Sequence, residues 1–447
     1  MHKFIPNTKN DIKEMLEVIG VKSIDDLFAD IPEEFRLKNE LNIKDGISEI
    51  ELRKHIMKIS NKNKSVDELT CFLGAGAYDH YKPSVINSLI SRSEFYTAYT
   101  PYQPEISQGT LKAIFEYQTM MSELTGMYAS NASLYDGQTA VVEAAIMAVV
   151  SKKKCETVLV SKSVHPETIK VLKTYLLHQN INIVEIELND GVTNVKDLEE
   201  KISKDVAAVI VQSPNFFGII EDIEPIEKVT HSLKSILIQS VDPMSLGILK
   251  NPGELGVDIA VGDAQCFGNP LNFGGPYLGF ISTTKKLFRK LPGRIVGESV
   301  DKDGIRAFVL TLQAREQHIR RERATSNICS NQGLNVLIAT IYLSTMGKEG
   351  VKEVGIQCIN KANYAIGKIT KSGKYSLLFN KPVFKEFAIK GNTEIKLLNE
   401  KLLNEDILGG YDLSKDYDEL KNVSLYAVTE KRTKEDIDKL SEILEVI

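Results

Sequence analysis

At 447 residues the chain is too long for one simple core, so two or three domains are expected. Its 60 acidic and 55 basic side chains give a net charge of -5, which argues against a nucleic-acid groove or a surface for anionic membranes. The longest apolar run, 144–150, is far too short to cross a membrane, and the first residues have no signal-peptide core. We therefore expect a cytoplasmic protein that binds neither nucleic acid nor membrane.

The cysteines predict reduced thiols and no metal site. No two of them form a Cys-x-x-Cys pair, and they are scattered along the chain at Cys71, Cys155, Cys266, Cys329 and Cys358. Cys266 is either a reactive thiol or, as for most such residues, a buried inert one.

Residues 1–65 are predicted to form a helical N-terminal arm. One helix is expected to end at Gly20, and a second to begin after Ser48. The second helix carries three apolar residues on one face, namely Leu52, Ile56 and Ile59. Nothing in the arm suggests chemistry, so its expected role is packing or clasping another subunit.

Residues 66–325 are predicted to form a large α/β domain. Short strands rich in Val and Ile are expected at 157–160, 183–188, 207–212, 235–241 and 258–263, with helices beginning near His165, Val195 and Ile223. This alternation predicts a mainly parallel sheet with right-handed crossovers, in which ligands bind beyond the carboxyl ends of the strands. Residues 326–447 are predicted to form a small α+β domain.

Several polar residues follow these strands or begin helices. Asp136-Gly137-Gln138-Thr139 begins a helix and is either a phosphate site on free N–H groups or an ordinary turn and cap. His165 either stacks on an aromatic ring or is polar filling. Asp242 either pairs with a pyridinium nitrogen or caps a turn, and Asp263 has the same two interpretations.

A loop rich in tyrosine and proline is the strongest candidate for binding. Residues 96–105 combine aromatic side chains with Gln103 and Glu105, and Pro101 and Pro104 restrict the backbone. A basic run follows at 315–323, and it either binds an anion or is a solvated helix face.

Four sequence strings resemble the glycine decarboxylase family, the P-protein of the glycine cleavage system. They are Phe72-Leu-Gly-Ala-Gly-Ala-Tyr-Asp-His-Tyr, Tyr99-Thr-Pro-Tyr-Gln-Pro-Glu-Ile-Ser-Gln-Gly, Asp242-Pro-Met-Ser-Leu-Gly and Arg320-Arg-Glu-Arg-Ala-Thr-Ser-Asn-Ile-Cys. The chain is most similar to the N-terminal half of that enzyme, where it is split into two polypeptides. The resemblance implies an aspartate-aminotransferase-like (fold-type-I) pyridoxal-phosphate fold that decarboxylates glycine and passes the aminomethyl group to the lipoyl arm of the H-protein.

The resemblance also implies where the cofactor lysine should stand, and this chain lacks it. In the family's catalytic chain a His-Lys pair precedes the glycine-rich turn, and counting back from Gly274-Gly275-Pro276 places that pair on Ala264 and Gln265. A neutral amide forms no imine, so pyridoxal phosphate is expected on a lysine-bearing subunit 2 homologue. The alternative is a self-sufficient enzyme that uses Lys250 or Lys285. These two lysines flank a segment that contains no lysine.

The family implies roles for several residues. His165 and Asp242 match its ring-stacking and pyridine-nitrogen positions, and Gly137 and Thr139 lie at the expected phosphate site, which suggests a relic pocket. We expect the tyrosine loop to line the partner's pocket or the lipoyl entrance, through Tyr99, Tyr102, Gln103 and Glu105. The alternative is a structural or regulatory partner that contributes no residue to the active site.

Overall fold

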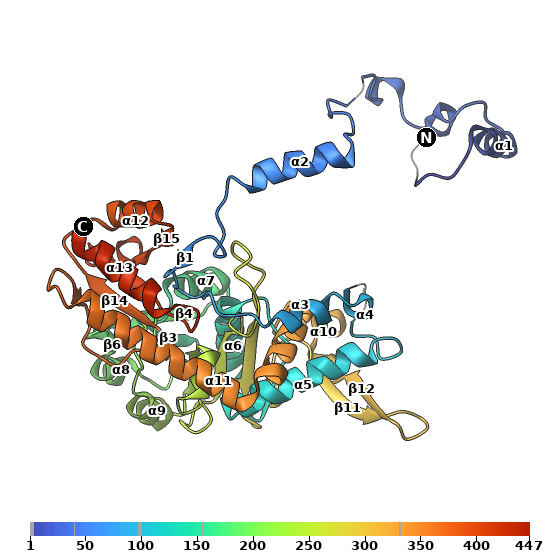
Figure 1. Cartoon of the computed structure of the whole chain (residues 1–447). Helices are drawn as coiled ribbons and strands as arrows, with labels where there is room; N and C mark the ends of the chain where they lie inside the picture. Colours follow the sequence, from blue (N-terminus) through green and yellow to red (C-terminus); the bar gives the residue numbers. More distant parts are fainter. Residues whose placement is uncertain (1–3, 40, 97–100, 153–154, 330–331) are drawn as a thin grey trace. The chain divides into compact units, whose positions relative to one another are not determined.

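Residues 4–39, 41–96, 101–152, 155–329 and 332–447 are described by the computed structural model of the chain (Figure 1). The chain divides into two units, Met1–Lys64 and Ser65–Ile447. Among the described residues no helix combines the length and apolar character needed to cross a membrane.

The first unit contains the two predicted helices, α1 (Lys9–Ile19) and α2 (Glu49–Ser60). Each begins with a reciprocal side-chain cap, and α1 ends at Gly20, whose φ of 86° is readily adopted by glycine. None of the described residues of this unit is buried. Leu52, Ile56 and Ile59 of α2 are about half exposed, at 46%, 52% and 47%.

The second unit is built on a seven-stranded sheet with the order β2-β10-β9-β8-β7-β3-β4. The strands are β2 (Ala129–Ser130), β3 (Thr157–Ser161), β4 (Asn182–Ile186), β7 (Val206–Gln212), β8 (Ile236–Val241), β9 (Ile259–Asp263) and β10 (Gly279–Thr283). Strands β4, β3, β7, β8 and β9 run parallel, and β10 is antiparallel to both of its neighbours. The mainly parallel sheet predicted from the Val- and Ile-rich segments is therefore present.

Helices cover both faces of this sheet because its apolar residues alternate in direction. Val158 and Val160 pack in the cluster of α6 (Gly137–Ser151) and α7 (Pro166–Leu176). Leu159, between them, packs in the cluster of α8 (Val195–Lys201) and α9 (Ile223–Ser232). Two further helices that pack against each other, α5 (Gln108–Thr125) and α11 (Gly333–Ile369), cover the part of the sheet near Val241 and Phe280.

Residues 376–447 form a second layered structure, here called the C-terminal lobe. Its antiparallel sheet has the order β13-β14-β17-β16, with bounds Ser376–Leu377, Glu386–Lys390, Val423–Ala427 and Tyr411–Asp412. Helices α12 (Ile395–Asn404) and α13 (Lys434–Val446) pack in its core together with the end of α11. Strand β15 (Ile407–Leu408) pairs with β1 (Thr70–Cys71), which joins the lobe to the start of this unit.

The remaining elements are short. They are α3 (Ser84–Ile90), α4 (Ser93–Tyr96), α10 (Gln317–Arg320), the pair β5 (Leu188–Asn189) and β6 (Val192–Thr193), and the hairpin of β11 (Val296–Val300) and β12 (Arg306–Leu310). The hairpin is not among the elements predicted from the sequence. The basic run at 315–323 forms only short helical turns.

Candidate functional site

A cavity of about 170 Å³ lies at the carboxyl ends of the central parallel strands. Gln212 ends β7, Asp242 follows β8 and Asp263 ends β9, and all three line the cavity. Its other walls are residues 75–78, the start of α6, and residues 384–386 at the start of β14. We call this cavity the relic pocket. It lies where parallel sheets usually bind ligands.

Four of the predicted cofactor positions lie together in this pocket: Gly137, His165, Asp242 and Gln265. Thr139 is not among the described lining residues of the pocket. Its amide donates to Asp136 at 2.8 Å, and its hydroxyl accepts from the Asp136 amide, so the two residues form the capping box of α6.

His165 caps α7 and is held in one tautomer. Its Nδ1 accepts from the amide of Glu167 at 3.1 Å, so Nε2 carries the proton and donates to the carbonyl of Ala75 at 2.8 Å. Burial lowers the pKa of His165 below its ordinary value, so the ring is neutral at neutral pH. The edge of the ring packs against Phe216, with centroids 4.7 Å apart.

Asp242 has a cationic partner inside the protein. Its Oδ2 lies 2.6 Å from Nζ of Lys385, a residue whose side chain is 2% exposed. Its Oδ1 accepts from the amide of Met244. The lysine comes from the C-terminal lobe, so this ion pair joins the two layered structures of the second unit.

Gln265 is fully engaged in hydrogen bonds. Its Oε1 accepts from the amide of Tyr78 at 3.0 Å, and its Nε2 donates to the carbonyls of Tyr78 and Asn269 at 3.1 and 2.7 Å. The amide therefore fixes the 75–78 wall of the relic pocket. It offers no amine, so the position where the family resemblance places the lysine does not fit a covalently held pyridoxal phosphate.

The tyrosine loop lies elsewhere. Tyr99 falls outside the described residues, and the described part of the loop, residues 96 and 101–105, contributes no lining residue to the relic pocket. Tyr102 is half-buried with its ring 5.4 Å from the guanidinium of Arg294, and burial raises its pKa to about 12. Gln103 and Glu105 are exposed.

Arg294 connects the tyrosine loop to two other segments. Its Nη1 pairs with the buried carboxylate of Glu316 at 2.5 Å, and its Nε donates to the carbonyl of Cys329 at 3.0 Å. One guanidinium group therefore contacts the tyrosine loop, the basic run and the segment after it. Sequence reasoning missed Arg294, because no pattern around it distinguishes it from a surface arginine.

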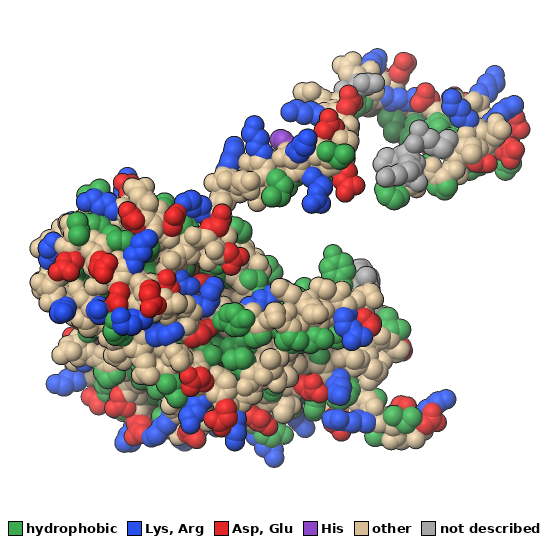
Figure 2. Space-filling view, viewed as in Figure 1, with side chains coloured by type: hydrophobic (Ala, Val, Ile, Leu, Met, Phe, Trp, Pro, Cys, Tyr) green, Lys and Arg blue, Asp and Glu red, His purple; other side chains and the backbone are tan. Residues whose placement is uncertain are grey.

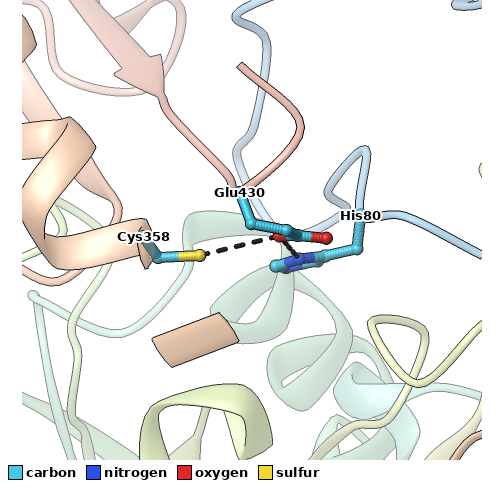
Figure 3. Close-up of side chains that lie close together, drawn as sticks. All are labelled: His80, Cys358 and Glu430. Carbon is cyan, nitrogen blue, oxygen red and sulfur yellow. Dashed lines mark hydrogen bonds and ion pairs between the residues drawn. The ribbon is translucent and has the colours of Figure 1, made fainter. Parts of the chain in front are cut away.

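His80, Cys358 and Glu430 lie close enough together to resemble a metal site (Figure 3). Nδ1 of His80 donates to Glu430 at 2.6 Å, and the Cys358 thiol lies 3.8 Å from the same carboxylate. Two observations oppose a metal here. Burial, reinforced by Glu430, raises the pKa of Cys358 to about 12, and Nε2 of His80 already faces the ammonium of Lys385 at 3.0 Å.

Residues 2–444 match the family model described as the glycine cleavage system P-protein. The chain belongs to this P-protein family.

Individual relatives extend the match over nearly the whole chain. A protein of Carboxydothermus hydrogenoformans named probable glycine dehydrogenase (decarboxylating) subunit 1 is 54% identical over 442 residues, which cover 99% of both chains. A Bacillus cereus (strain B4264) protein of the same name is 54% identical over 440 residues, covering 98% of both.

Solved structures confirm the predicted fold-type-I architecture. The crystal structure of glycine decarboxylase (P-protein) of the glycine cleavage system, in inhibitor-bound form, has a TM-score of 0.91, with 38% identity and full coverage of both chains. The sphingosine-1-phosphate lyase of Burkholderia pseudomallei has a TM-score of 0.67 over 92% of both chains at 12% identity, which shows the fold alone.

For this member of the P-protein family, neither alternative lysine lies in the pocket. Lys250 pairs with Glu224 at 3.3 Å and is mostly exposed, and Lys285 lies over the ring of Tyr128. Among the described residues the one lysine that lines the relic pocket is Lys385, which sequence reasoning missed. The signal available was the pair Lys385-Glu386 inside the otherwise apolar segment 383–389.

Proposed function

We propose that this chain is the subunit without the Schiff-base lysine in a two-chain glycine dehydrogenase (decarboxylating). With a lysine-bearing homologue it decarboxylates glycine and transfers the aminomethyl group to the lipoyl arm of the H-protein. The partner carries pyridoxal phosphate, and this chain alone is inactive. The observation that carries the proposal is Gln265, which is buried and fully hydrogen-bonded at the position of the family's lysine. The names of the full-length relatives support the assignment to subunit 1.

Exposed apolar surface supports the requirement for a partner. On the face shown in Figure 2, hydrophobic side chains gather in the region of α3 and α5, whereas acidic and basic side chains are interspersed over the C-terminal lobe. The exposed large hydrophobic residues of α3, α4, the segment between α4 and α5, and the start of α11 include Val85, Tyr96, Ile106 and Leu334. Exposed apolar side chains gathered on one face are typical of a protein interface.

Within this proposal the tyrosine loop serves the partner's active site. Tyr102 keeps its proton at neutral pH, because burial raises its pKa to about 12, so it acts as a hydrogen-bond donor. Glu105 is an exposed carboxyl group on the same loop and is the candidate proton acceptor. Arg294 holds Tyr102 in place through its contact with the ring.

Reconstitution tests the proposal. We expect this chain to show no cofactor absorbance and no glycine-dependent carboxyl exchange alone, and its mixture with the lysine-bearing homologue to exchange. An imine trapped by borohydride on this chain alone, or an inactive mixture, would contradict the proposal.

Two loop substitutions separate an active-site role from a purely structural or regulatory one. We expect Tyr102→Phe and Glu105→Gln to lower the turnover of the mixture by roughly 10²-fold or more without weakening the binding of the partner. Glu116→Gln on the exposed face of α5 and Tyr175→Phe are matched controls. Unchanged turnover in both loop variants would favour a partner that contributes no residue to the chemistry.

A further inference from the structure

Lys385 has a partner for each of its three ammonium protons. The Nζ atom lies 2.6 Å from Asp242, 3.0 Å from Nε2 of His80 and 3.5 Å from the ring centroid of Tyr78. Burial lowers the pKa of Lys385, but the carboxylate of Asp242 outweighs burial, and the pKa lies above its ordinary value. The ammonium is therefore charged, and both it and Asp242 belong to the lining of the relic pocket.

Carboxylates accept from the N–H groups of the helix start that the sequence predicted as a phosphate site. The amide of Gly137 donates to Asp263 at 3.0 Å, and the amide of Thr139 donates to Asp136 at 2.8 Å. Asp263 also accepts from the amides of Gln265 and Leu278. A phosphate at this helix start would lose these N–H groups and would face two acidic side chains.

The third wall ties the pocket to the C-terminal lobe. Glu386 accepts from the amide of Ala75 at 2.6 Å and from the hydroxyl of Tyr78 at 2.7 Å. In the same loop, Asp79 pairs with Lys431 at 2.6 Å and with Arg432 at 3.0 Å. The loop of residues 75–81 is thus held between Gln265 on one side and the C-terminal lobe on the other.

We propose that Lys385 replaces the cofactor in the relic pocket: its ammonium is a built-in ligand of Asp242 that excludes pyridoxal phosphate and clamps the C-terminal lobe to the main sheet. In this chain the carboxylate of Asp242 is a structural cation site, and its cation is a side chain of the same chain. The inference goes beyond the proposed function and concerns the chain alone. An inactive mixture with the homologue would leave it standing, and its failure would leave the proposed function standing.

Ligand binding by the full chain tests the exclusion. Pyridoxine phosphate is the suitable probe, because its alcohol replaces the aldehyde and it forms no imines with surface lysines. We expect no saturable binding to the wild-type chain in equilibrium dialysis, at concentrations that load the lysine-bearing homologue. Saturable one-to-one binding by the wild-type chain would overturn the exclusion.

Chemical rescue tests the cation site. Lys385→Ala removes four non-hydrogen side-chain atoms, three carbons and the ammonium nitrogen, and n-propylammonium contains the same four atoms. The substitution leaves Asp242 without its cation. We expect the melting temperature to fall by on the order of 10 °C and to recover in a saturable way with n-propylammonium but not with 1-propanol. Lys390→Ala, at the exposed end of β14, is the matched control and should show neither effect. Equal stability of the two variants, or equal responses to the amine, would overturn the assignment.

If Lys385→Ala does not fold, a double variant that replaces both charged residues with neutral ones still tests the ion pair. We expect Lys385→Met with Asp242→Asn to be more stable than Lys385→Met alone, since no buried charge is left unpaired. The clamp also predicts that the amides of Ala75 and Tyr78 exchange with solvent roughly tenfold faster in the double variant than in Lys390→Met. A double variant no more stable than the single one would overturn the ion pair, and unchanged exchange would overturn the clamp.

Discussion

Several ionisable side chains are buried in this protein, and a different set of interactions determines the charge of each. Lys385 keeps its charge because Asp242 lies 2.6 Å away. Glu430 is also ionised: burial alone would raise its pKa, but His80 and the amide of Tyr81 bring it to about 2. Glu143, on the inner side of α6 and 3% exposed, has no such partner, and burial raises its pKa to about 7 despite the hydroxyl of Ser326.

The raised pKa of Glu143 makes folding stability depend on pH. From about pH 4.5, the ordinary value, to about pH 7, the folded protein holds this proton and the unfolded chain releases it. The contribution of Glu143 to the free energy of unfolding therefore falls as pH rises through this window. We expect Glu143→Gln to match the wild type near pH 4.5 and to be more stable by up to about 3 kcal/mol at pH 8. Urea unfolding at both pH values measures this. Glu200→Gln, on the exposed side of α8, should show no such gain, and a gain for Glu143→Gln that is independent of pH would contradict the explanation.

At the scale of elements, the contact between the segment after β7 and the start of β14 holds the C-terminal lobe against the main sheet. The amide of Phe384 donates to the carbonyl of Gly218 at 3.1 Å. A Cβ on Gly218 would lie 1.9 Å from the carbonyl oxygen of Glu386, and the φ of Gly218 is +81°. A side chain at this position would push β14, and with it Lys385 and Glu386, away from the relic pocket.

Gly218→Ala tests the importance of this close approach. We expect it to destabilise the chain by about 3 kcal/mol or more, because a positive φ and a clash with backbone atoms combine. Gly367→Ala is the matched control: it lies within α11 with open space around its Cβ, and should stabilise by roughly 0.5–1 kcal/mol. Thermal unfolding of the full chain distinguishes the two. A mild effect at Gly218 would show that the lobe can shift at little cost.

At the scale of the whole molecule, the first unit lacks a core of its own. None of its described residues is buried, although α2 carries an apolar face and both of its helices are well capped. Caps and helix propensity stabilise a helix only weakly without tertiary packing. This unit is therefore a candidate contact surface in the proposed assembly.

Substitutions on the two faces of α2 test this contact. Under the proposed function, we expect Leu52→Ser with Ile56→Ser to weaken the complex with the lysine-bearing homologue by about tenfold or more. The melting temperature of the chain alone should stay unchanged. Lys54→Ser with Lys58→Ser alters two exposed basic residues of the same helix and serves as the control. Sedimentation of the mixture measures the affinity, and equal affinities for both pairs would exclude this face from the interface.

Local patterns in the sequence determined most of the elements. The Val- and Ile-rich runs became strands of the parallel sheet, and the long helix α11 is interrupted at Gly347, whose φ is 60°. Caps such as Ser48 also act within a few residues of their partners. Gln265 could be recognised at the lysine position because the flanking strings resemble a known family. These features were readable because the interactions behind them are short in sequence or repeat with the period of the element.

Only the tertiary structure decided which side chain pairs with Asp242 in the relic pocket. Lys385 and His80 are 305 residues apart, and they meet only because the C-terminal lobe packs on the carboxyl edge of the main sheet. The contact of Arg294 with Tyr102 likewise joins distant segments. Side chains from separate elements share a site only after those elements have packed, so no local pattern identifies them. The sequence by itself could thus place Gln265 at the position where the family resemblance predicts a lysine, and the packing of the C-terminal lobe determined that Lys385 pairs with Asp242.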